Sequence, residues 1–210
     1  MTAPPWPPLP ALPALPAWPA PPPLLWCWRH PRAQGAAGRC IGRTDLAVNP
    51  RKAKRLAHRI RQCARRHGLP QAVCVSPLRR ARDVGRWLAR WGWQVQVNPL
   101  LAEVDFGRWD GLRWADIAPA EVGAWADDLL HHAPGGGESV ADVARRVRAF
   151  VDSGNSGNSG GPRLIVGHGG WINTLLHVAP GCTAIAAAHW PAPPPHGALR
   201  CWPAATPASH

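Results

Sequence analysis

A chain of 210 residues, 46% of them hydrophobic, is long enough for one domain with a sizeable core, and its formal net charge of +12 favours anionic partners without choosing among phosphates, nucleic acid and acidic lipid. No apolar run approaches the roughly 18 residues of a membrane helix, and the N-terminus lacks the basic region of a secretory signal. None of the six cysteines forms a C-x-x-C pair, so we expect neither a zinc ribbon nor a thioredoxin-type motif, and a reduced cytoplasm is the simpler setting.

The 26 prolines crowd towards the two ends of the chain. Residues 1–23 repeat Leu-Pro-Ala, and because proline fixes φ and removes a backbone donor, we predict a disordered tail there. A tract that binds a polyproline-reading partner is the alternative. A second disordered tail is predicted for residues 204–210, which leaves a domain over residues 24–203.

Between the tails, apolar runs that suit strands alternate with amphipathic runs that suit helices. Residues 24–28 are continuously apolar, as in a buried parallel strand. Residues 49–67 predict a helix, with Pro50 in its first turn and Gly68 at its end. The later elements, in chain order, are a strand at 72–75, a helix at 79–91, a strand at 94–97, a helical stretch at 112–130 broken at Pro119, a helix at 139–151, a Ser/Gly/Asn loop at 153–161, a strand at 164–166, a short helix from Trp171 and a last strand at 199–202. This alternation predicts an α/β domain with a mainly parallel sheet.

Polar residues follow four of the predicted strands at the point where each strand ends. In chain order they are Arg29-His30, Ser76 with the arginines after it, Glu103 and His168. In open α/β sheets, ligands bind outside the carboxyl ends of the strands. The sequence therefore predicts one site that contains two histidines, several arginines and a carboxylate.

This set of side chains suits phosphoryl chemistry. Arginine binds phosphate oxygens as a bidentate fork, and surrounding cations keep a neutral imidazole available to attack phosphorus. A carboxyl group can protonate the leaving oxygen, and the N–H groups of Gly169 and Gly170, which open a helix, add an anion cradle. The pattern predicts a phosphatase or phosphomutase that forms a covalent phosphohistidine and uses no metal or cofactor.

Several segments in a fixed order resemble the histidine phosphatase (phosphoglycerate mutase-like) superfamily. They are Arg29-His30 at the end of the first strand, Gly-Arg-Cys-Ile-Gly-Arg-Thr-Asp-Leu at 38–46, Ser-Pro-Leu-Arg-Arg-Ala at 76–81, Glu-Val-Asp-Phe-Gly-Arg-Trp-Asp-Gly at 103–111, Gly-Gly-Gly-Glu-Ser at 135–139 and Val-Gly-His-Gly-Gly at 166–170. The likeness runs from about residue 25 to residue 176. It implies a three-layer α/β sandwich, with helices on both faces of a mainly parallel sheet.

The resemblance implies a role for each matching residue. His30 is the expected phosphorylated nucleophile, and Glu103 is the expected general acid and later base, with Asp105 as its rival. The residues expected to hold the phosphoryl group or the rest of the substrate are Arg29, Gly42, Arg43, Arg80, the catalytic His168, and Gly169 through its backbone N–H.

Within the superfamily, Arg-His-Pro, Gly-x-Cys-x-Gly-Arg-x-Asp-Leu and Glu-x-Asp-Phe-Gly-x-Trp look most like α-ribazole phosphatase. The expected partner is therefore a small phosphorylated metabolite, and the expected reaction removes the 5′-phosphate of α-ribazole phosphate in cobalamin assembly. Departures at Pro31, Ile41, Asp83 and Asp110 remove no catalytic group, but they leave the substrate open. Mutase members usually carry insertions beyond this compact core, which favours a phosphatase.

Three other functions stay open. A phosphoglycerate mutase-like phosphotransferase uses the same residues, whereas a non-catalytic phosphate-binding or interaction module would form no phosphoenzyme. A nucleic-acid binder would use the basic run at 51–66. A solvated basic helix face is the better interpretation of that run, because no stacking aromatics interleave it. We expect no membrane partner, and the oligomeric state has no signal in the sequence.

Overall fold

The computed structural model describes residues 24–153, 163–178 and 182–203. The predicted tails at 1–23 and 204–210, and nearly all of the predicted loop at 153–161, lie outside this part of the chain. The five predicted strands lie inside it, and each begins and ends within one residue of its expected position.

The strands form one sheet in the order β3-β2-β4-β1-β5. The first four run parallel, and β5 pairs antiparallel with β1 at one edge. In the central pair Arg29 lies opposite Gly167, so the residues that follow β1 and β4 emerge side by side. The strands are β1 Leu25–Arg29, β2 Ala72–Val75, β3 Gln94–Val97, β4 Arg163–Gly167 and β5 Leu199–Trp202. The predicted α/β fold with a mainly parallel sheet is confirmed.

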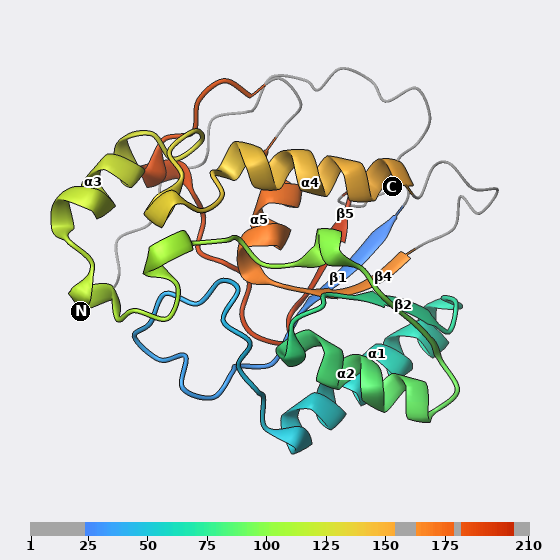
Figure 1. Cartoon of the computed structure of the whole chain (residues 1–210). Coiled ribbons are helices and arrows are strands. Elements are labelled where there is room, and N and C mark those ends of the chain that lie inside the picture. The colour runs from blue at the N-terminus through green and yellow to red at the C-terminus, as the bar shows by residue number, and fades with distance from the viewer. Residues whose placement is uncertain (1–23, 154–162, 179–181, 204–210) are drawn as a thin grey trace, which may run out of the picture.

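Helices cover both faces of the sheet, as Figure 1 shows, with α1 and α2 below it and α4 and α5 above it. Their bounds are α1 Pro50–His67, α2 Arg79–Arg90, α4 Val140–Ser153 and α5 Gly169–His177. The predicted three-layer sandwich is therefore confirmed. Among the described residues, no helix has both the length and the apolarity that crossing a membrane requires.

The alternation of side chains along the central strands divides the core into two halves. Trp28 and Val166 pack with α1 and α2 on one face of the sheet. Cys27 and Ile165 point to the other face, where they pack with Phe150 of α4 and with α5. Because both faces of β1 and β4 are buried, these strands read in the sequence as continuous apolar runs.

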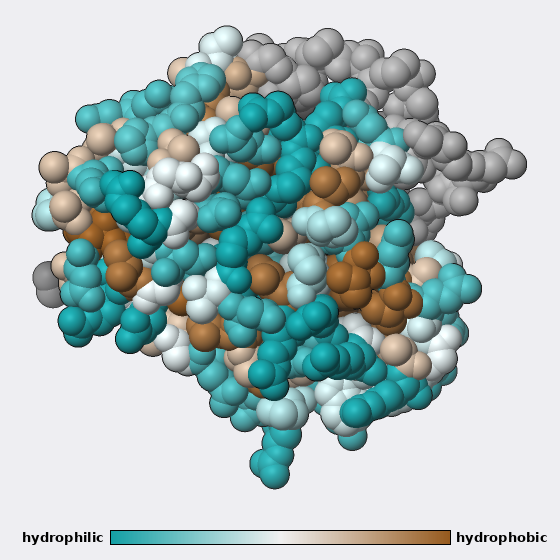
Figure 2. All heavy atoms as spheres, viewed as in Figure 1, coloured by the Kyte–Doolittle hydropathy of each residue, from teal (hydrophilic) through white to brown (hydrophobic). Residues whose placement is uncertain are grey.

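Helix α1 buries one narrow apolar face and leaves its basic residues in solvent. Asn49 caps its start by accepting a hydrogen bond from the N–H of Arg51 at 2.9 Å, and Gly68 ends it with a left-handed φ of 61°. The buried positions are Ala53, Leu56, Ala57, Ile60 and Ala64. Figure 2 shows deep teal, the most hydrophilic colour, over the neighbouring α2. The lysine and arginine side chains of α1 are exposed as well, which agrees with the predicted solvated basic face of this helix.

The stretch predicted as a helix broken at Pro119 is more irregular than expected. It contains α3, Pro119–Asp127, and a 3-10 turn, but no helix from residue 112. The backbone is extended at Arg113, with a ψ of 142°, and at Ile117, with a ψ of 131°, which interrupts the helical path, and α3 has no buried residue to anchor a longer helix. The 3-10 turns of the described chain are η1 Pro99–Leu101, η2 Gly107–Trp109, η3 Trp114–Asp116, η4 Pro134–Gly136 and η5 Ala187–His189.

Candidate active site

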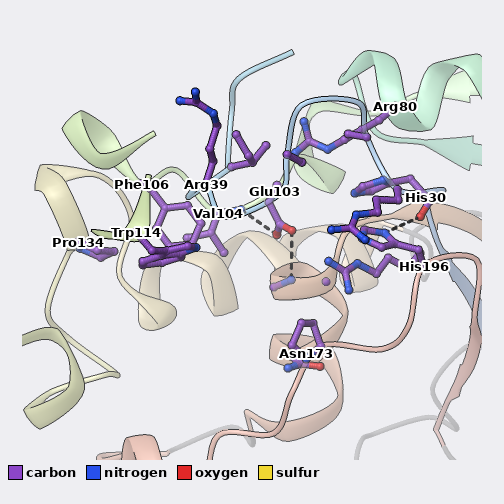
Figure 3. A pocket seen from close by; sticks show the side chains of 18 of the residues that line it. His30, Arg39, Arg80, Glu103, Val104, Phe106, Trp114, Pro134, Asn173 and His196 are labelled. Carbon is purple, nitrogen blue, oxygen red and sulfur yellow. Dashed lines mark hydrogen bonds between the residues drawn. The ribbon is translucent and has the colours of Figure 1, made fainter. Parts of the chain in front are cut away.

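A cleft of about 490 Å³ lies at the carboxyl ends of the parallel strands (Figure 3). Five of the predicted site residues line it: Arg29, His30, Arg80, Glu103 and Gly169. Arg29 and His30 lie at the end of β1, and Gly169 begins α5 just after β4. Arg80 lies in the first turn of α2, and Glu103 lies in the segment after β3. The structure therefore brings together the residues that strand-end reasoning placed at one edge of the sheet.

His30 follows β1 and is 5% exposed. Its Nδ1 lies 2.7 Å from the carbonyl oxygen of Pro31. Because a carbonyl only accepts, Nδ1 must carry the proton and donate, which leaves the lone pair on Nε2 free. Burial, followed by the charge of Arg80, lowers the pKa of His30 well below its ordinary value, although the Pro31 carbonyl opposes this. At neutral pH the imidazole is therefore uncharged.

His168 lies against His30 and is fully buried. The two ring centroids are 4.9 Å apart. Nε2 of His168 lies 2.6 Å from Oγ of Ser76, and its Nδ1 accepts a hydrogen bond from Nε of Arg80 at 3.2 Å. Burial, with His30 and Arg80 next in effect, lowers the pKa of His168 well below its ordinary value. His168, predicted as a phosphate ligand, thus contacts His30 and Arg80, which together with Arg29 form the predicted phosphate-binding corner. His168 itself is absent from the residues that line the cleft.

The two arginines of this corner are held by backbone carbonyl groups. Arg80 is 1% exposed and donates to the oxygens of Thr44 at 2.8 Å and Gly42 at 2.5 Å. Arg29 donates to Pro194 at 2.7 Å. Burial lowers the pKa of both guanidinium groups, which stay charged at neutral pH because arginine titrates so high. The corner therefore presents fixed positive charge beside His30.

Glu103 follows η1, the turn after β3, and its carboxylate lies against the first turn of α5. Oε1 accepts from the N–H of Trp171 at 3.2 Å and of Val104 at 3.0 Å, and Oε2 accepts from Gly170 at 3.3 Å. The expected anion cradle is therefore corrected at Gly170, whose N–H binds this carboxylate. A helix N-terminus attracts hydrogen-bond acceptors, and at α5 the acceptor is the Glu103 side chain of the protein itself. Gly169 stays on the cleft wall, next to the Arg29 guanidinium.

Gly42 and Arg43 are not among the residues that line the cleft. The side chain of Asp110 accepts from the backbone N–H groups of Gly42 at 3.1 Å and Thr44 at 3.0 Å, and also from that of Arg43. The Arg43 side chain pairs with Glu138 at 3.2 Å. These contacts fix residues 42–44 so that the carbonyl oxygens of Gly42 and Thr44 accept hydrogen bonds from Arg80.

His196 is a cleft residue that the sequence analysis missed. Its Nδ1 donates to the carbonyl oxygen of His30 at 3.1 Å, and the two rings lie 5.3 Å apart. Burial, and next the charge of Arg29, lowers its pKa to about 4. The pairing of β5 with β1 would have placed His196 in the site. Because β5 runs antiparallel to β1, the residues just before β5 lie at the carboxyl end of β1.

A family model described as the histidine phosphatase superfamily, branch 1, matches residues 25–197. The chain belongs to this superfamily. The family predicted from the sequence is confirmed.

The chain is similar to several named proteins. A glucosyl-3-phosphoglycerate phosphatase of Mycobacterium tuberculosis is 32% identical over 173 residues, which cover 72% of this chain and 76% of the relative. A probable phosphoglycerate mutase of Yersinia enterocolitica is 30% identical over 157 residues, covering 70% of each. A bifunctional protein of Mycobacterium tuberculosis is 42% identical over 120 residues, but the match covers 55% of this chain and only 32% of that protein.

Two solved structures show the likeness of the fold. The mycobacterial glucosyl-3-phosphoglycerate phosphatase in complex with inorganic phosphate gives a TM-score of 0.62 at 32% identity, covering 73% of this chain and 76% of that one. A Thermus thermophilus protein gives a TM-score of 0.61 at 24% identity, covering 86% and 94% of the two chains, and this likeness bears on the fold alone. The finer resemblance to α-ribazole phosphatase stays a prediction.

Proposed function

We propose that this histidine phosphatase hydrolyses a small phosphomonoester through a phosphohistidine on His30. The supporting observation is the geometry of that residue. Its ring is buried and neutral, its Nδ1–H is held by the Pro31 carbonyl, and Arg29 and Arg80 share the cleft wall with it. A neutral imidazole with one fixed tautomer presents its Nε2 lone pair to phosphorus without a prior proton transfer.

The reaction has two halves. In the first, the Nε2 lone pair of His30 forms the N–P bond while the ester P–O bond breaks, and the carboxyl proton of Glu103 passes to the departing oxygen. In the second, the Glu103 carboxylate takes a proton from water, the water oxygen bonds to phosphorus, and the N–P electron pair returns to Nε2. Arg29 and Arg80 stabilise the charge on the transferring group throughout.

Hydrolysis is favoured over transfer by the resemblance to glucosyl-3-phosphoglycerate phosphatase, although a probable phosphoglycerate mutase is similar over a comparable length. The substrate is the finer part of the proposal. α-Ribazole phosphate is supported by the sequence motifs, and glucosyl-3-phosphoglycerate by the named relatives. A panel of these two esters and 3-phosphoglycerate separates them, with 2-phosphoglycerate formation marking a mutase.

The experiment that tests the mechanism is hydrolysis of p-nitrophenyl phosphate in the presence of a chelator. The wild-type protein should turn over and yield an acid-labile phosphoenzyme on rapid quenching. His30→Ala should lose both signals. His58→Ala, which removes an exposed histidine of α1 outside the cleft, is the matched control and should keep both. Turnover that survives in His30→Ala would overturn the proposal.

A further inference from the structure

Aromatic side chains gather around one part of the cleft. The rings of Phe106 and Trp114 have centroids 6.3 Å apart at 81°, and those of Phe106 and Trp125 are 6.2 Å apart at 88°. Trp114 and Trp125 are nearly parallel, with 13° between their planes. Trp109 is buried and supports Trp125 edge-on at 5.9 Å. Edge-to-face contacts of this kind hold rings in defined orientations, so the group forms a preformed apolar surface, which we name the aromatic wall: Phe106, Trp114 and Trp125.

Glu103 lies between the aromatic wall and the phosphate-binding corner. In Figure 3, His30 and Arg80 lie on one side of Glu103, and Phe106 and Trp114 lie on the other. All of them line the same cleft. A general acid must reach the ester oxygen. An ester whose phosphorus is at His30 and whose oxygen is at Glu103 therefore extends its alcohol portion towards the aromatic wall.

The surroundings of the wall suit an uncharged ring. Apolar side chains of Ile41, Val104, Pro134 and Val140 also line the cleft. Trp114 keeps 40% of its surface exposed, which leaves an indole face for a ligand. Sugar hydroxyl or carboxylate groups placed there would lose water and need polar partners.

Three charged side chains line the cleft besides Arg29, Arg80 and Glu103: Arg32, Arg39 and Glu138. Glu138 accepts from Arg146 at 2.9 Å and from Arg43 at 3.2 Å, so its charge is compensated. Arg39 donates to the neutral carbonyl oxygen of Gly111 at 2.8 Å, and both Arg39 and Arg32 are exposed to solvent, which screens their charge. Among the arginines that line the cleft, the two shielded from solvent are Arg29 and Arg80, at the phosphate-binding corner.

We infer that the aromatic wall is the leaving-group site, and that it selects phosphomonoesters whose alcohol carries an uncharged aromatic ring. This inference rests on the proposed function, because it takes the phosphorus position from His30. Stacking and edge contacts to Trp114 and Trp125 provide the selectivity, while the phosphate-binding corner treats all esters alike.

The test compares two esters of unactivated primary alcohols, 2-naphthylmethyl phosphate and n-butyl phosphate. The kcat/KM for the naphthyl ester should be at least about tenfold higher, in the range that apolar pockets achieve. Trp114→Ala and Trp125→Ala should each remove most of that advantage, measured as the ratio of kcat/KM for the naphthyl ester to kcat/KM for n-butyl phosphate. Trp114→Phe should restore it. Trp91→Ala, at the end of α2 and outside the cleft lining, is the matched control and should keep the full advantage.

A binding measurement separates this inference from the proposed mechanism. Calorimetry with 2-naphthylmethylphosphonate and n-butylphosphonate needs no turnover, so it reports on the aromatic wall even if His30 is not the nucleophile. Tighter binding of the naphthyl compound that Trp114→Ala abolishes supports the inference. Equal binding of the two phosphonates would overturn it, as would a preference for 3-phosphoglycerate that depends on Arg39.

Discussion

The guanidinium Nε of Arg80 donates a hydrogen bond to Nδ1 of His168 over 3.2 Å. Arginine has no acceptor, so His168 must be protonated on Nε2, which then donates to Oγ of Ser76 at 2.6 Å. The three side chains form a buried relay of hydrogen bonds, and Oγ of Ser76 also accepts from the N–H of Leu78 at 3.2 Å. The relay orients the Arg80 guanidinium and fixes the His168 imidazole beside His30.

Replacing Ser76 by alanine should destabilise the fold by about 1–3 kcal/mol, because the N–H on Nε2 of His168 loses its acceptor in a fully buried place. The free energy of unfolding in urea measures this. Ser153→Ala removes the hydroxyl of an exposed serine on α4 and is the control, with little change expected. A loss at Ser76 no larger than at Ser153 would contradict the relay.

The buried histidines should stay neutral well below pH 6.5. Burial and positive neighbours penalise the imidazolium form, which lowers the pKa of His30 and His168. Long-range ¹H–¹⁵N spectra should show His30 as the Nδ1–H form and His168 as the Nε2–H form. As the pH falls below 6.5, His30 and His168 take up protons in the unfolded chain but stay neutral in the folded chain. The free energy of unfolding should therefore decrease. A midpoint for His30 at or above 6.5 would be inconsistent with its burial.

Glu103→Gln should affect esters according to their leaving groups. For alkyl phosphates, kcat should fall roughly 10²–10⁴-fold, since the departing alkoxide needs a proton. For p-nitrophenyl phosphate, phosphorylation of His30 should persist, and the phosphoenzyme should accumulate because water lacks its base. Asp105→Asn is the control, as the Asp105 side chain accepts from the N–H of Gly107 at 2.8 Å and does not line the cleft. The reverse pattern would make Asp105 the acid.

The two glycines at the start of α5 should give different kinetic defects when changed to alanine. A Cβ at Gly170 would lie 2.7 Å from Oε1 of Glu103, so Gly170→Ala should displace the acid and lower kcat about tenfold or more. A Cβ at Gly169 would lie 3.1 Å from Cζ of Arg29, so Gly169→Ala should chiefly raise KM. Gly123→Ala, where a Cβ meets nothing within 4 Å, is the control and should leave both constants unchanged.

The convergence of His30, Arg80, Glu103 and His168 was predictable because it depends only on strand order. Each residue comes shortly after a predicted strand, and parallel strands end at the same edge of a sheet. The family resemblance then distinguished Arg80 from Arg79. Sequence patterns also gave the helices on both faces, since α1 has a clear N-cap, a clear stop and one apolar stripe.

The rest of the site depends on contacts between distant loops, which local patterns do not carry. Arg43 was expected to face the substrate, but Glu138, 95 positions later, pairs with its side chain. The N–H of Gly170 was expected to be free for an anion, but it donates to Glu103. Glu103 follows β3, whereas Gly170 follows β4, and β2 lies between these two strands in the sheet. His196 follows a Pro-rich run without strand or helix signals, and only the pairing of β5 with β1 brings it to His30.

The aromatic wall is carried by residues 106–125, an excursion between β3 and α4 that adds no strand to the sheet. His30, Arg29 and Arg80, in contrast, stand on the sheet and on α2. One residue of the excursion connects the two parts, because Asp110 holds residues 42–44, whose carbonyl oxygens accept from Arg80. Duplicated copies of such a gene can therefore change the aromatic positions of the excursion and accept new esters, provided that Asp110 is kept. The same separation makes the aromatic positions of residues 106–125 the natural ones to exchange when a protein engineer wants another specificity on this scaffold.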